Sequence, residues 1–433
     1  GKCNNMKTIA FVPAKGKSER IENKNKQILD GEYLFKRKLR QLLDCEEIDE
    51  VWLDSEDKEI HELAQDLPIK HHYRDPALAD NNTDGHQMFA NESKITSADI
   101  IVQVLCTAPF VDKNVIDPAL KKLKASDKTS LVAVTEQKLY LWEDGKPLYG
   151  EKIPNSVDLP THIIESMSFY AVKTKQQAVD KRYTNDAILY PLKTIESVDI
   201  NNNDDLKLAQ TICAGQRAKR IQQLKILSKS ISSCLISDVC KEHGVKHFLS
   251  KDIKLLNTGS FLGYAKTLKL KKLDQPKEWE GIFDALGSYS FVEPGDVIVV
   301  STDVQDKAYF GELNAHFAYR NGAVGVVVDG KTRDVDRVTQ IGLPLCAHGR
   351  QSDDIRFEGT LETMNMPISI NNVTVRNNDL IFGDADGVVC IPAEKWNFIL
   401  DHVKKALKKE MLVKLEATFG EDPFEVLNKI GTF

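Results

Sequence analysis

The stretch TIAFVPAKGKSER, residues 8–20, decides how the first half of this chain folds. A short apolar run predicts a buried strand, and the loop after it carries Gly16 among Lys and Arg side chains. Such a loop can aim backbone N–H groups at phosphates while its cations neutralise their charge. The spacing fits neither the Walker A loop nor the Gly-x-Gly-x-x-Gly dinucleotide fingerprint. The stretch therefore predicts a phosphate-binding loop of another kind, with a solvated Lys-rich turn as the alternative.

Strand-like and helix-like segments alternate through the rest of the first half. Strands are expected at residues 49–54, 99–106, 131–135 and 168–172, and helices at 33–43 and 56–66. This alternation is typical of βαβ units and a mostly parallel sheet. Ligands of such sheets bind beyond the carboxyl ends of the strands, so we expect the functional loops there.

The pattern changes near residue 204. Residues 204–231 contain no turn cluster and are rich in Lys, Arg and Gln, which predicts a long solvated helix between two domains. Gly- and Pro-punctuated strands follow, and they predict a compact α/β unit with a mixed sheet. The tail, residues 393–433, has an amphipathic helical pattern. We predict domains at residues 1–213 and 228–433, joined by a helical linker at 214–227.

The composition limits the classes of function. The chain has 433 residues, of which 42% are hydrophobic and 28% charged, and its net charge is −6. These values suit a globular protein and provide no basic footprint for nucleic acid. We find no apolar run long enough for a membrane span, no signal-peptide core and no Cys-x-x-Cys pair. We expect a cytoplasmic protein without a nucleic-acid or membrane partner.

Four blocks in the first half resemble, in order, the acylneuraminate cytidylyltransferases, which transfer CMP from CTP to acidic sugars. They lie at residues 12–25, 74–80, 102–110 and 199–206. Glu19 stands where that family has Lys, with Lys17 or Arg20 able to supply the charge. The resemblance implies a Rossmann-like nucleotidyltransferase sheet of the GT-A type. It also implies that an acidic acceptor, a 2-keto sugar acid or a phosphonate, attacks the α-phosphorus of CTP and releases pyrophosphate.

The same resemblance assigns roles to individual residues. Lys24 would be catalytic. The nucleotide would be bound by Ala14, Lys15, Gly16, Ser18, Arg20, Asn25 and Arg74. The acceptor would be bound by Gln103, Thr107 and Glu165. Asp199 and Asn201 would hold Mg²⁺ or Mn²⁺. Asn201 replaces an acidic residue of the family, so it keeps an oxygen ligand but loses a charge, and we expect weaker metal binding.

A second constellation lies in the second half. Glu312, Leu313 and Asn314 begin a predicted helix, and Arg333-Asp334 follows a Gly-rich apolar segment. A guanidinium at a strand end can bind a 2-oxo-carboxylate through two hydrogen bonds, and a helix N-terminus can hold the same carboxylate. Asp334 can ligate a hard divalent cation, and Glu312 can orient a water molecule. The alternative is that Arg333 and Asp334 form a plain surface salt bridge.

The spacing from Glu312 to Arg333-Asp334 resembles the RraA-like family, which includes the class II 4-hydroxy-4-methyl-2-oxoglutarate aldolases. The likeness covers about residues 228–400. It implies an α/β swivelling domain that assembles as trimers or hexamers. It also implies catalytic roles for Glu312 and Arg333, carboxylate binding by Leu313, Asn314 and Arg333, and Mg²⁺ or Mn²⁺ on Asp334. The implied reaction is retro-aldol cleavage or decarboxylation that yields pyruvate or another 2-oxo acid.

The two halves together predict a bifunctional fusion protein. It would use CTP and a small acidic acceptor in one half and a 2-oxo acid in the other, and it would form a homo-oligomer. The alternative is a cytidylyltransferase whose RraA-like domain is a non-catalytic oligomerisation scaffold.

Overall fold

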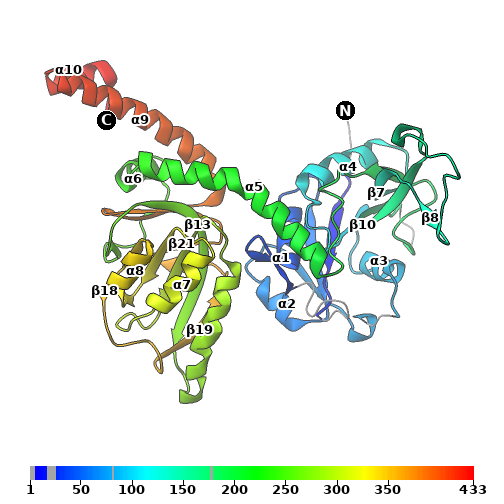
Figure 1. Ribbon diagram of the computed structural model, residues 1–433, viewed down its shortest axis with the longest axis horizontal. Helices are drawn as coiled ribbons and strands as arrows, with labels where there is room; N and C mark the ends of the chain where they lie inside the picture. Colours follow the sequence, from blue (N-terminus) through cyan, green and yellow to red (C-terminus); the bar gives the residue numbers. More distant parts are fainter. Residues whose placement is uncertain (1–4, 17–25, 80–81, 176–178) are drawn as a thin grey trace. The chain divides into compact units, whose positions relative to one another are not determined.

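A computed structural model describes residues 5–16, 26–79, 82–175 and 179–433. The chain divides into two compact units, Gly1–Ala214 and Gly215–Phe433 (Figure 1). Helix α5, Asn203–Ser230, runs across the boundary between them. It covers the stretch for which the sequence predicts a bridging helix.

The first unit is built on a seven-stranded sheet in the order β11-β7-β10-β6-β1-β4-β5. Its strands are β1 (Thr8–Pro13), β4 (Glu50–Ser55), β5 (Lys70–Tyr73), β6 (Ile100–Val104), β7 (Ser130–Lys138), β10 (Thr161–Lys173) and β11 (Ile188–Pro191). All neighbouring pairs are parallel except those of β10, which runs antiparallel to both β6 and β7. The predicted mostly parallel sheet is therefore present.

Short helices and hairpins surround this sheet. The helices are α1 (Leu34–Leu43), α2 (Lys58–Leu63), η2 (Pro76–Ala79), α3 (Gly85–Ser93), α4 (Lys113–Ala125) and η3 (Ser156–Asp158). The hairpins pair β2 (Ile28–Leu29) with β3 (Glu32–Tyr33) and β8 (Trp142–Glu143) with β9 (Lys146–Pro147). Helix α3 starts at a capping box in which Asp84 and Gln87 bind each other's backbone N–H, which fixes where this helix begins.

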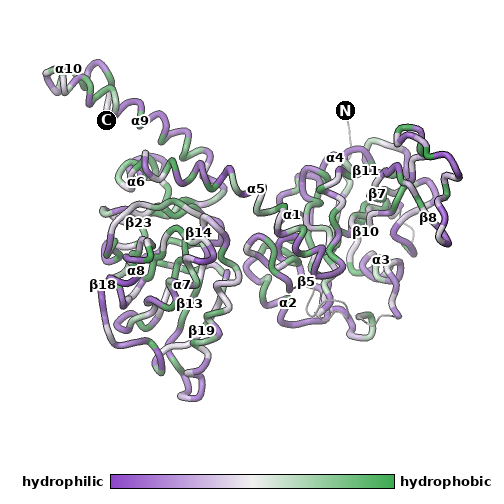
Figure 2. The backbone as a smooth tube through the Cα atoms, in the orientation of Figure 1, coloured by the Kyte–Doolittle hydropathy of each residue, from purple (hydrophilic) through white to green (hydrophobic). Residues whose placement is uncertain are grey.

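Both faces of the first sheet are covered by apolar side chains. Along β1, Ala10 and Val12 belong to one hydrophobic cluster, whereas Ile9 and Phe11 belong to another on the opposite face. This alternation follows from the two-residue period of a strand. Figure 2 shows hydrophobic residues concentrated in these central strands. Burial on both faces holds β1 rigidly, so its carboxyl end is a firm platform for the loop that begins at Ala14.

The second unit contains an eight-stranded mixed sheet, as predicted. Its order is β12-β17-β15-β14-β13-β22-β23, with β19 paired to β13. The strands are β12 (Lys254–Leu255), β13 (Phe261–Lys272), β14 (Asp296–Thr302), β15 (Gly325–Asp329), β17 (Leu345–Ala347), β19 (Gly359–Met364), β22 (Leu380–Asp384) and β23 (Gly387–Ile391). Strands β13, β14, β15 and β17 are parallel neighbours, and the remaining pairs are antiparallel.

The remaining elements of the second unit are helices and small sheets. The helices are α6 (Ser233–Glu242), η4 (Pro276–Phe291), α7 (Glu312–Arg320), α8 (Val335–Ile341), η5 (Ala393–Lys395), α9 (Trp396–Thr418) and α10 (Pro423–Ile430). The small sheets pair β16 (Lys331–Thr332) with β18 (Gly349–Arg350) and β20 (Ile368–Ile370) with β21 (Val373–Val375). None of the helices in the described part of the chain is long and apolar enough to cross a bilayer.

The second half of α5 packs against the second unit through buried charges. Arg217 pairs with Asp296, and Lys266 Nζ lies 3.3 Å from the same carboxylate. Asp296 is completely buried, and burial raises its pKa although both cations oppose that shift. Leu224, nearby on α5, is 5% exposed. The stretch predicted as a solvated linker thus presents one buried stripe to the second unit.

Candidate functional sites

The carboxyl ends of three strands in the first unit converge on one region. The Ala14 backbone nitrogen, just after β1, donates to the Asp54 carbonyl at the end of β4, at 2.9 Å. Cys106, just after β6, places its thiol 3.6 Å from the Pro13 carbonyl. The Thr107 carbonyl accepts a 2.8 Å bond from the Ile200 backbone nitrogen. Predicted nucleotide, acceptor and metal residues are therefore brought together here.

Acidic side chains hold the start of the predicted phosphate loop. The Gly16 backbone nitrogen donates to Glu56 Oε1 at 2.7 Å. A Cβ atom at Gly16 would lie 2.5 Å from Asp57 Oδ2, so this position has no room for a side chain. Asp57 is also 3.0 Å from Lys26 Nζ. Lys15 is partly buried beside them. Four predicted residues of this loop lie outside the described residues: Ser18, Arg20, Lys24 and Asn25.

Arg74 supports the same loop from beneath. It is 3% exposed, and its Nη2 atom lies 3.3 Å from the Ala14 carbonyl and 3.2 Å from the Asp54 carbonyl. The same nitrogen lies 3.2 Å from Glu56 Oε2. The guanidinium is thus engaged by protein atoms. Its predicted contact with the nucleotide stays a prediction, and its contact with Ala14 is a supporting role.

A buried polar network lies below Arg74. Gln103 Nε2 donates to Glu92 Oε1 at 2.6 Å, and both residues are completely buried. Burial, and then the nearby Asp54 carboxylate, raise the pKa of Glu92 well above its usual value. Four buried atoms there have no hydrogen-bond partner: Asp54 Oδ1, Arg74 Nε, Glu92 Oε2 and Gln103 Oε1. A proton on Glu92 would allow it to donate to Asp54. The sequence pattern contains no signal for Glu92, which lies on an ordinary amphipathic helix.

Lys38 fixes the loop that follows β6. Its ammonium is completely buried and donates to the carbonyls of Ala108, at 2.8 Å, and Val111, at 2.6 Å. It also donates to Gln41 Oε1 at 2.6 Å. Burial lowers the pKa of Lys38 to about 7. Sequence reasoning missed this residue because it reads as one cation of an amphipathic helix.

The other predicted acceptor residues lie on and beside β10. Glu165 is exposed and accepts a 3.0 Å hydrogen bond from Tyr170 across a β-bulge. Tyr170 is paired in register with Gln103 on β6, and the Arg182 guanidinium lies 4.8 Å from the Tyr170 ring centroid. Tyr170 therefore binds Glu165 and is the neighbour of Gln103 in the sheet, while Gln103 itself is in the interior.

Asp199 and Asn201 form the predicted metal position. Asn201 Nδ2 donates to Asp199 Oδ2 at 2.9 Å, and the Asn201 backbone nitrogen donates to Asp205 at 2.9 Å. Across the described ranges, no group of three or more His, Cys, Asp or Glu side chains is placed to hold a metal. One carboxylate and one amide oxygen instead suit Mg²⁺, which usually takes one or two carboxylates together with water and substrate phosphates.

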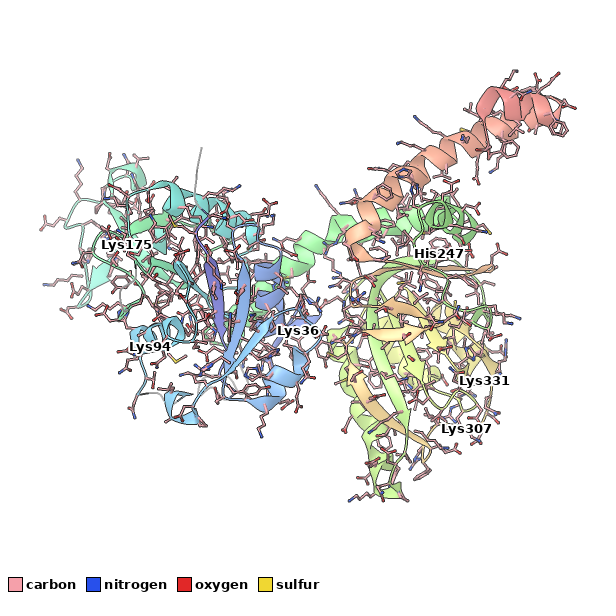
Figure 3. All side chains as sticks on the ribbon, turned by 180° about the vertical axis from the view of Figure 1, so that it is seen from behind. Lys36, Lys94, Lys175, His247, Lys307 and Lys331 are labelled. Carbon is pink, nitrogen blue, oxygen red and sulfur yellow. The ribbon has the colours of Figure 1, made fainter. Side chains whose placement is uncertain are left out.

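A second candidate site occupies a cavity of about 400 Å³ in the second unit. Its lining includes all five residues predicted there: Glu312, Leu313, Asn314, Arg333 and Asp334. Two chain segments meet to form it. Ala308 bridges to Lys331, and the Phe310 carbonyl accepts bonds from Thr332 Oγ1, at 2.6 Å, and from the Arg333 backbone nitrogen, at 3.1 Å. Figure 3 labels Lys331 in this region.

Asp334 connects the two segments at the entrance to α7. Its Oδ2 atom accepts a 3.1 Å hydrogen bond from the Glu312 backbone nitrogen, where the helix dipole favours a negative charge. A Cβ at Gly311 would lie 2.8 Å from the same oxygen. Asp334 has φ +57°, and Phe310 has φ +79°, which is unusual for a bulky residue. Both residues line the cavity, and strained backbone of this kind occurs at many functional sites.

Arg333 is held only loosely by the protein. Its side chain is 44% exposed, and its nitrogens lie 3.5 Å from the Ser352 carbonyl and 3.7 Å from Asp354 Oδ1. Both distances are at or beyond the limit of a good hydrogen bond. This geometry leaves the guanidinium suited to bind a carboxylate ligand. Glu312, in contrast, is paired with Arg337 at 3.1 Å.

The other predicted carboxylate-binding residues differ in burial. Leu313 is 78% exposed at the start of α7. Asn314 Oδ1 accepts a 3.0 Å hydrogen bond from Tyr289, whose pKa is raised by burial. Sequence reasoning missed several lining residues, among them Asp354, Arg356 and the apolar residues of η4. No motif marks them, because η4 has no helical or strand periodicity that points to this cavity.

Comparison with known proteins gives two family matches. A family model described as Aldolase/RraA matches residues 233–390, and one described as Cytidylyltransferase matches residues 9–179. A putative 4-hydroxy-4-methyl-2-oxoglutarate aldolase of Halalkalibacterium halodurans is 31% identical over 159 residues, which cover 36% of this chain and 72% of that protein.

Two further proteins illustrate the similarity of each half. A pseudaminic acid cytidylyltransferase of Campylobacter jejuni is 31% identical over 139 residues, which cover 30% of this chain and 59% of that protein. The crystal structure of an unusual member of the RNase ES inhibitor RraA family from Streptomyces coelicolor has a TM-score of 0.40 and 24% identity. It covers 45% of this chain and 96% of that chain. The chain spans 59%, or less than two thirds, of the length of that cytidylyltransferase.

Proposed function

This chain belongs to the RraA-like family and also carries a cytidylyltransferase domain, and from that premise we propose that it is a bifunctional enzyme. Its first unit would transfer CMP from CTP to a small acidic acceptor and release pyrophosphate. Its second unit would cleave or decarboxylate a 2-oxo acid with the help of a divalent metal ion. The proposal for the first unit is supported by contacts at the carboxyl ends of β1 and β6, where the Cys106 thiol reaches the Pro13 carbonyl and Ile200, next to Asp199, binds the Thr107 carbonyl.

The first unit would work mainly by positioning and charge neutralisation. An acceptor oxygen attacks the α-phosphorus while pyrophosphate leaves, and the protein holds both in line. Asp199 and the Asn201 amide oxygen would hold Mg²⁺, which neutralises the charge that develops on the phosphates. Arg74 and Lys38 would keep the two adjoining loops in place. The acceptor would be a 2-keto sugar acid or a phosphonate.

Pyrophosphate release tests this activity. The full chain is incubated with CTP, Mg²⁺ and a panel of 2-keto sugar acids and phosphonates, beside an Asp199→Ala variant. We expect release with at least one acceptor and a strong decrease in the variant. If no acceptor yields pyrophosphate and calorimetry detects no CTP binding, the proposal for the first unit is wrong.

The proposal for the second unit is supported by the cavity that joins Arg333, Asp334 and the start of α7. Arg333 would bind the carboxylate of the 2-oxo acid, and the first N–H groups of α7 would assist. Asp334 would hold Mg²⁺ or Mn²⁺. One carboxylate with water and substrate oxygens is a donor set that fits these hard cations. A divalent ion held there would supply Lewis-acid polarisation of the 2-oxo group.

Pyruvate release tests the second activity. Oxaloacetate and 4-hydroxy-2-oxo acids are supplied with Mg²⁺, and pyruvate is measured for the parent chain, Arg333→Ala and Asp334→Ala. We expect release by the parent chain and at least a hundredfold loss in both variants. Equal rates in all three proteins would contradict the assignment.

A non-catalytic oligomerisation scaffold is the second candidate for this unit. Helices α9 and α10 and the turn between them favour it, because they expose large apolar side chains: Met411 (65%), Leu412 (50%), Leu415 (49%), Phe419 (83%) and Phe424 (74%). Exposed apolar patches of this kind are typical of contact surfaces. If this unit is a scaffold, the chain should sediment as a homo-oligomer and should release no pyruvate from any 2-oxo acid.

A further inference from the structure

The cavity of the second unit has two chemically different walls. One wall is polar and carries Arg333, Asp334 and the N-terminus of α7. The apolar side chains of the lining, called the apolar wall below, belong to Ile282, Phe283, Ala285, Leu286, Phe317 and Ile355. A ligand that fills this cavity would therefore have an anionic group that binds the polar residues and an apolar group that contacts the apolar wall.

Some side chains of η4 are buried in the hydrophobic core, whereas others line the cavity and form part of the apolar wall. Ala285 and Tyr289 are 1% and 5% exposed and belong to the hydrophobic core. Phe283 and Leu286 are instead 50% and 45% exposed, and Phe317 on α7 is 39% exposed. Large exposed apolar side chains beside a few polar groups are typical of a ligand pocket.

We propose that this site takes a 2-oxo acid whose distal part is an alkyl or aryl group. The inference rests on the proposed function, since it extends the carboxylate site of Arg333. The cavity of about 400 Å³ has room for about 13 water molecules. Pyruvate alone would leave most of that volume filled with water against the apolar wall. An apolar arm would displace this water, which favours binding.

Arg356 is the residue that a dicarboxylic substrate would bind with its second carboxylate. It lines the same cavity, and a dicarboxylic acid would find it as a second cation. Its guanidinium, however, is covered by aromatic rings, with centroids at 4.8 Å for Phe357, 5.4 Å for Trp279 and 5.9 Å for Phe283. Stacking of this kind engages the cation, and the side-chain stem extends the apolar surface. The aryl or alkyl arm is therefore the better match.

Calorimetry with two stable probes distinguishes a ligand with an apolar distal group from a dicarboxylic acid. Phenylpyruvate and 2-oxoglutarate are titrated into the full chain with Mg²⁺, beside Phe283→Ser, Arg356→Gln and the control Phe398→Ser. Phe398 is also 50% exposed, but it lies on α9 and outside the cavity lining. We expect phenylpyruvate to bind at least tenfold tighter than 2-oxoglutarate. Phe283→Ser should remove that preference, and the control should keep it.

Two outcomes would overturn the inference. If 2-oxoglutarate binds as tightly and Arg356→Gln weakens it, the distal group is anionic. If Phe283→Ser changes the sedimentation coefficient but not phenylpyruvate binding, the apolar wall is an interface between copies of the chain.

A cleavage assay separates this inference from the proposed function. In 4-hydroxy-4-phenyl-2-oxobutanoate the C3–C4 bond breaks, the C4 hydroxyl loses its proton and becomes the carbonyl of benzaldehyde, and C3 takes a proton to give pyruvate. We expect faster pyruvate release from this compound than from 4-hydroxy-2-oxoglutarate. Release from the dicarboxylate alone contradicts the inference and keeps the lyase. Tighter phenylpyruvate binding without any cleavage keeps the inference and contradicts the lyase.

Discussion

Gln103 Nε2 lies 2.6 Å from Glu92 Oε1, and neither side chain is exposed to solvent. Glutamine has the shape of a protonated glutamate, so we expect Glu92→Gln to retain folding and pyrophosphate release. Glu92→Ala should lower the free energy of unfolding by about 2–4 kcal/mol, because it leaves a cavity and an unpaired Gln103 amide. Chemical denaturation of both variants checks this, and equal stability of the two would contradict it.

The raised pKa of Glu92 also predicts a pH dependence of stability. Between the usual value of 4.5 and the raised pKa, the folded state holds a proton that the unfolded state has lost. The stabilising contribution is therefore complete below pH 4.5 and is lost as pH rises through this window. We expect the melting temperature of Glu92→Gln to exceed that of the parent chain by more at pH 8 than at pH 5. A constant difference would argue against a protonated Glu92.

The lowered pKa of Lys38 predicts the opposite dependence of stability on pH. Its pKa of about 7 in the folded protein lies below the usual 10.5, so the unfolded state binds more protons between these values. Its contribution to stability then rises with pH across that window, by at most about 1.4 kcal/mol per pH unit. We expect Lys38→Met to flatten this rise, measured by urea denaturation at pH 7, 8 and 9. The substitution Lys122→Met, at an exposed lysine of helix α4, is the control and should keep the rise.

We expect a substitution at Asn201 to change the Mg²⁺ concentration that pyrophosphate release requires. Asn201→Asp replaces an amide that donates to Asp199 Oδ2 with a second carboxylate. We expect the Mg²⁺ concentration for half-maximal pyrophosphate release to fall several-fold, since each added carboxylate strengthens binding of a hard cation. Without metal, repulsion between the carboxylates should lower the melting temperature. Asn202→Asp adds the same charge one residue away and should leave the Mg²⁺ dependence unchanged.

Asp334 has a structural and a proposed chemical role that two substitutions separate. Asp334→Asn keeps an oxygen for the Glu312 N–H, whereas Asp334→Ala removes the cap. We expect both variants to lose pyruvate release, but only Asp334→Ala to lose about 1 kcal/mol of stability. Thermal unfolding and the pyruvate assay measure the two effects. An active Asp334→Asn variant would mean that the carboxylate charge is not needed.

Local sequence patterns predicted much of the architecture. The ordered blocks in each half predicted the cytidylyltransferase and RraA-like assignments, and the family matches confirm both. The α/β fold class is also confirmed. Alternating strand and helix patterns predicted the mostly parallel first sheet, because strand burial imposes a two-residue period that a sequence records directly. The spacing of Glu312 and Arg333 likewise predicted residues that line one cavity.

The sequence by itself determined the two family assignments and the order of the elements, and it predicted Arg333 and Asp334 as site residues, which line one cavity. Only the tertiary structure decided what surrounds them. Glu92 became a buried partner of Gln103, Arg74 became a support for Ala14, and η4 brought apolar side chains into the cavity that Arg333 lines. The physical reason is that motifs record spacing along the chain. Burial, pKa and pocket shape instead depend on side chains that packing brings together from distant elements.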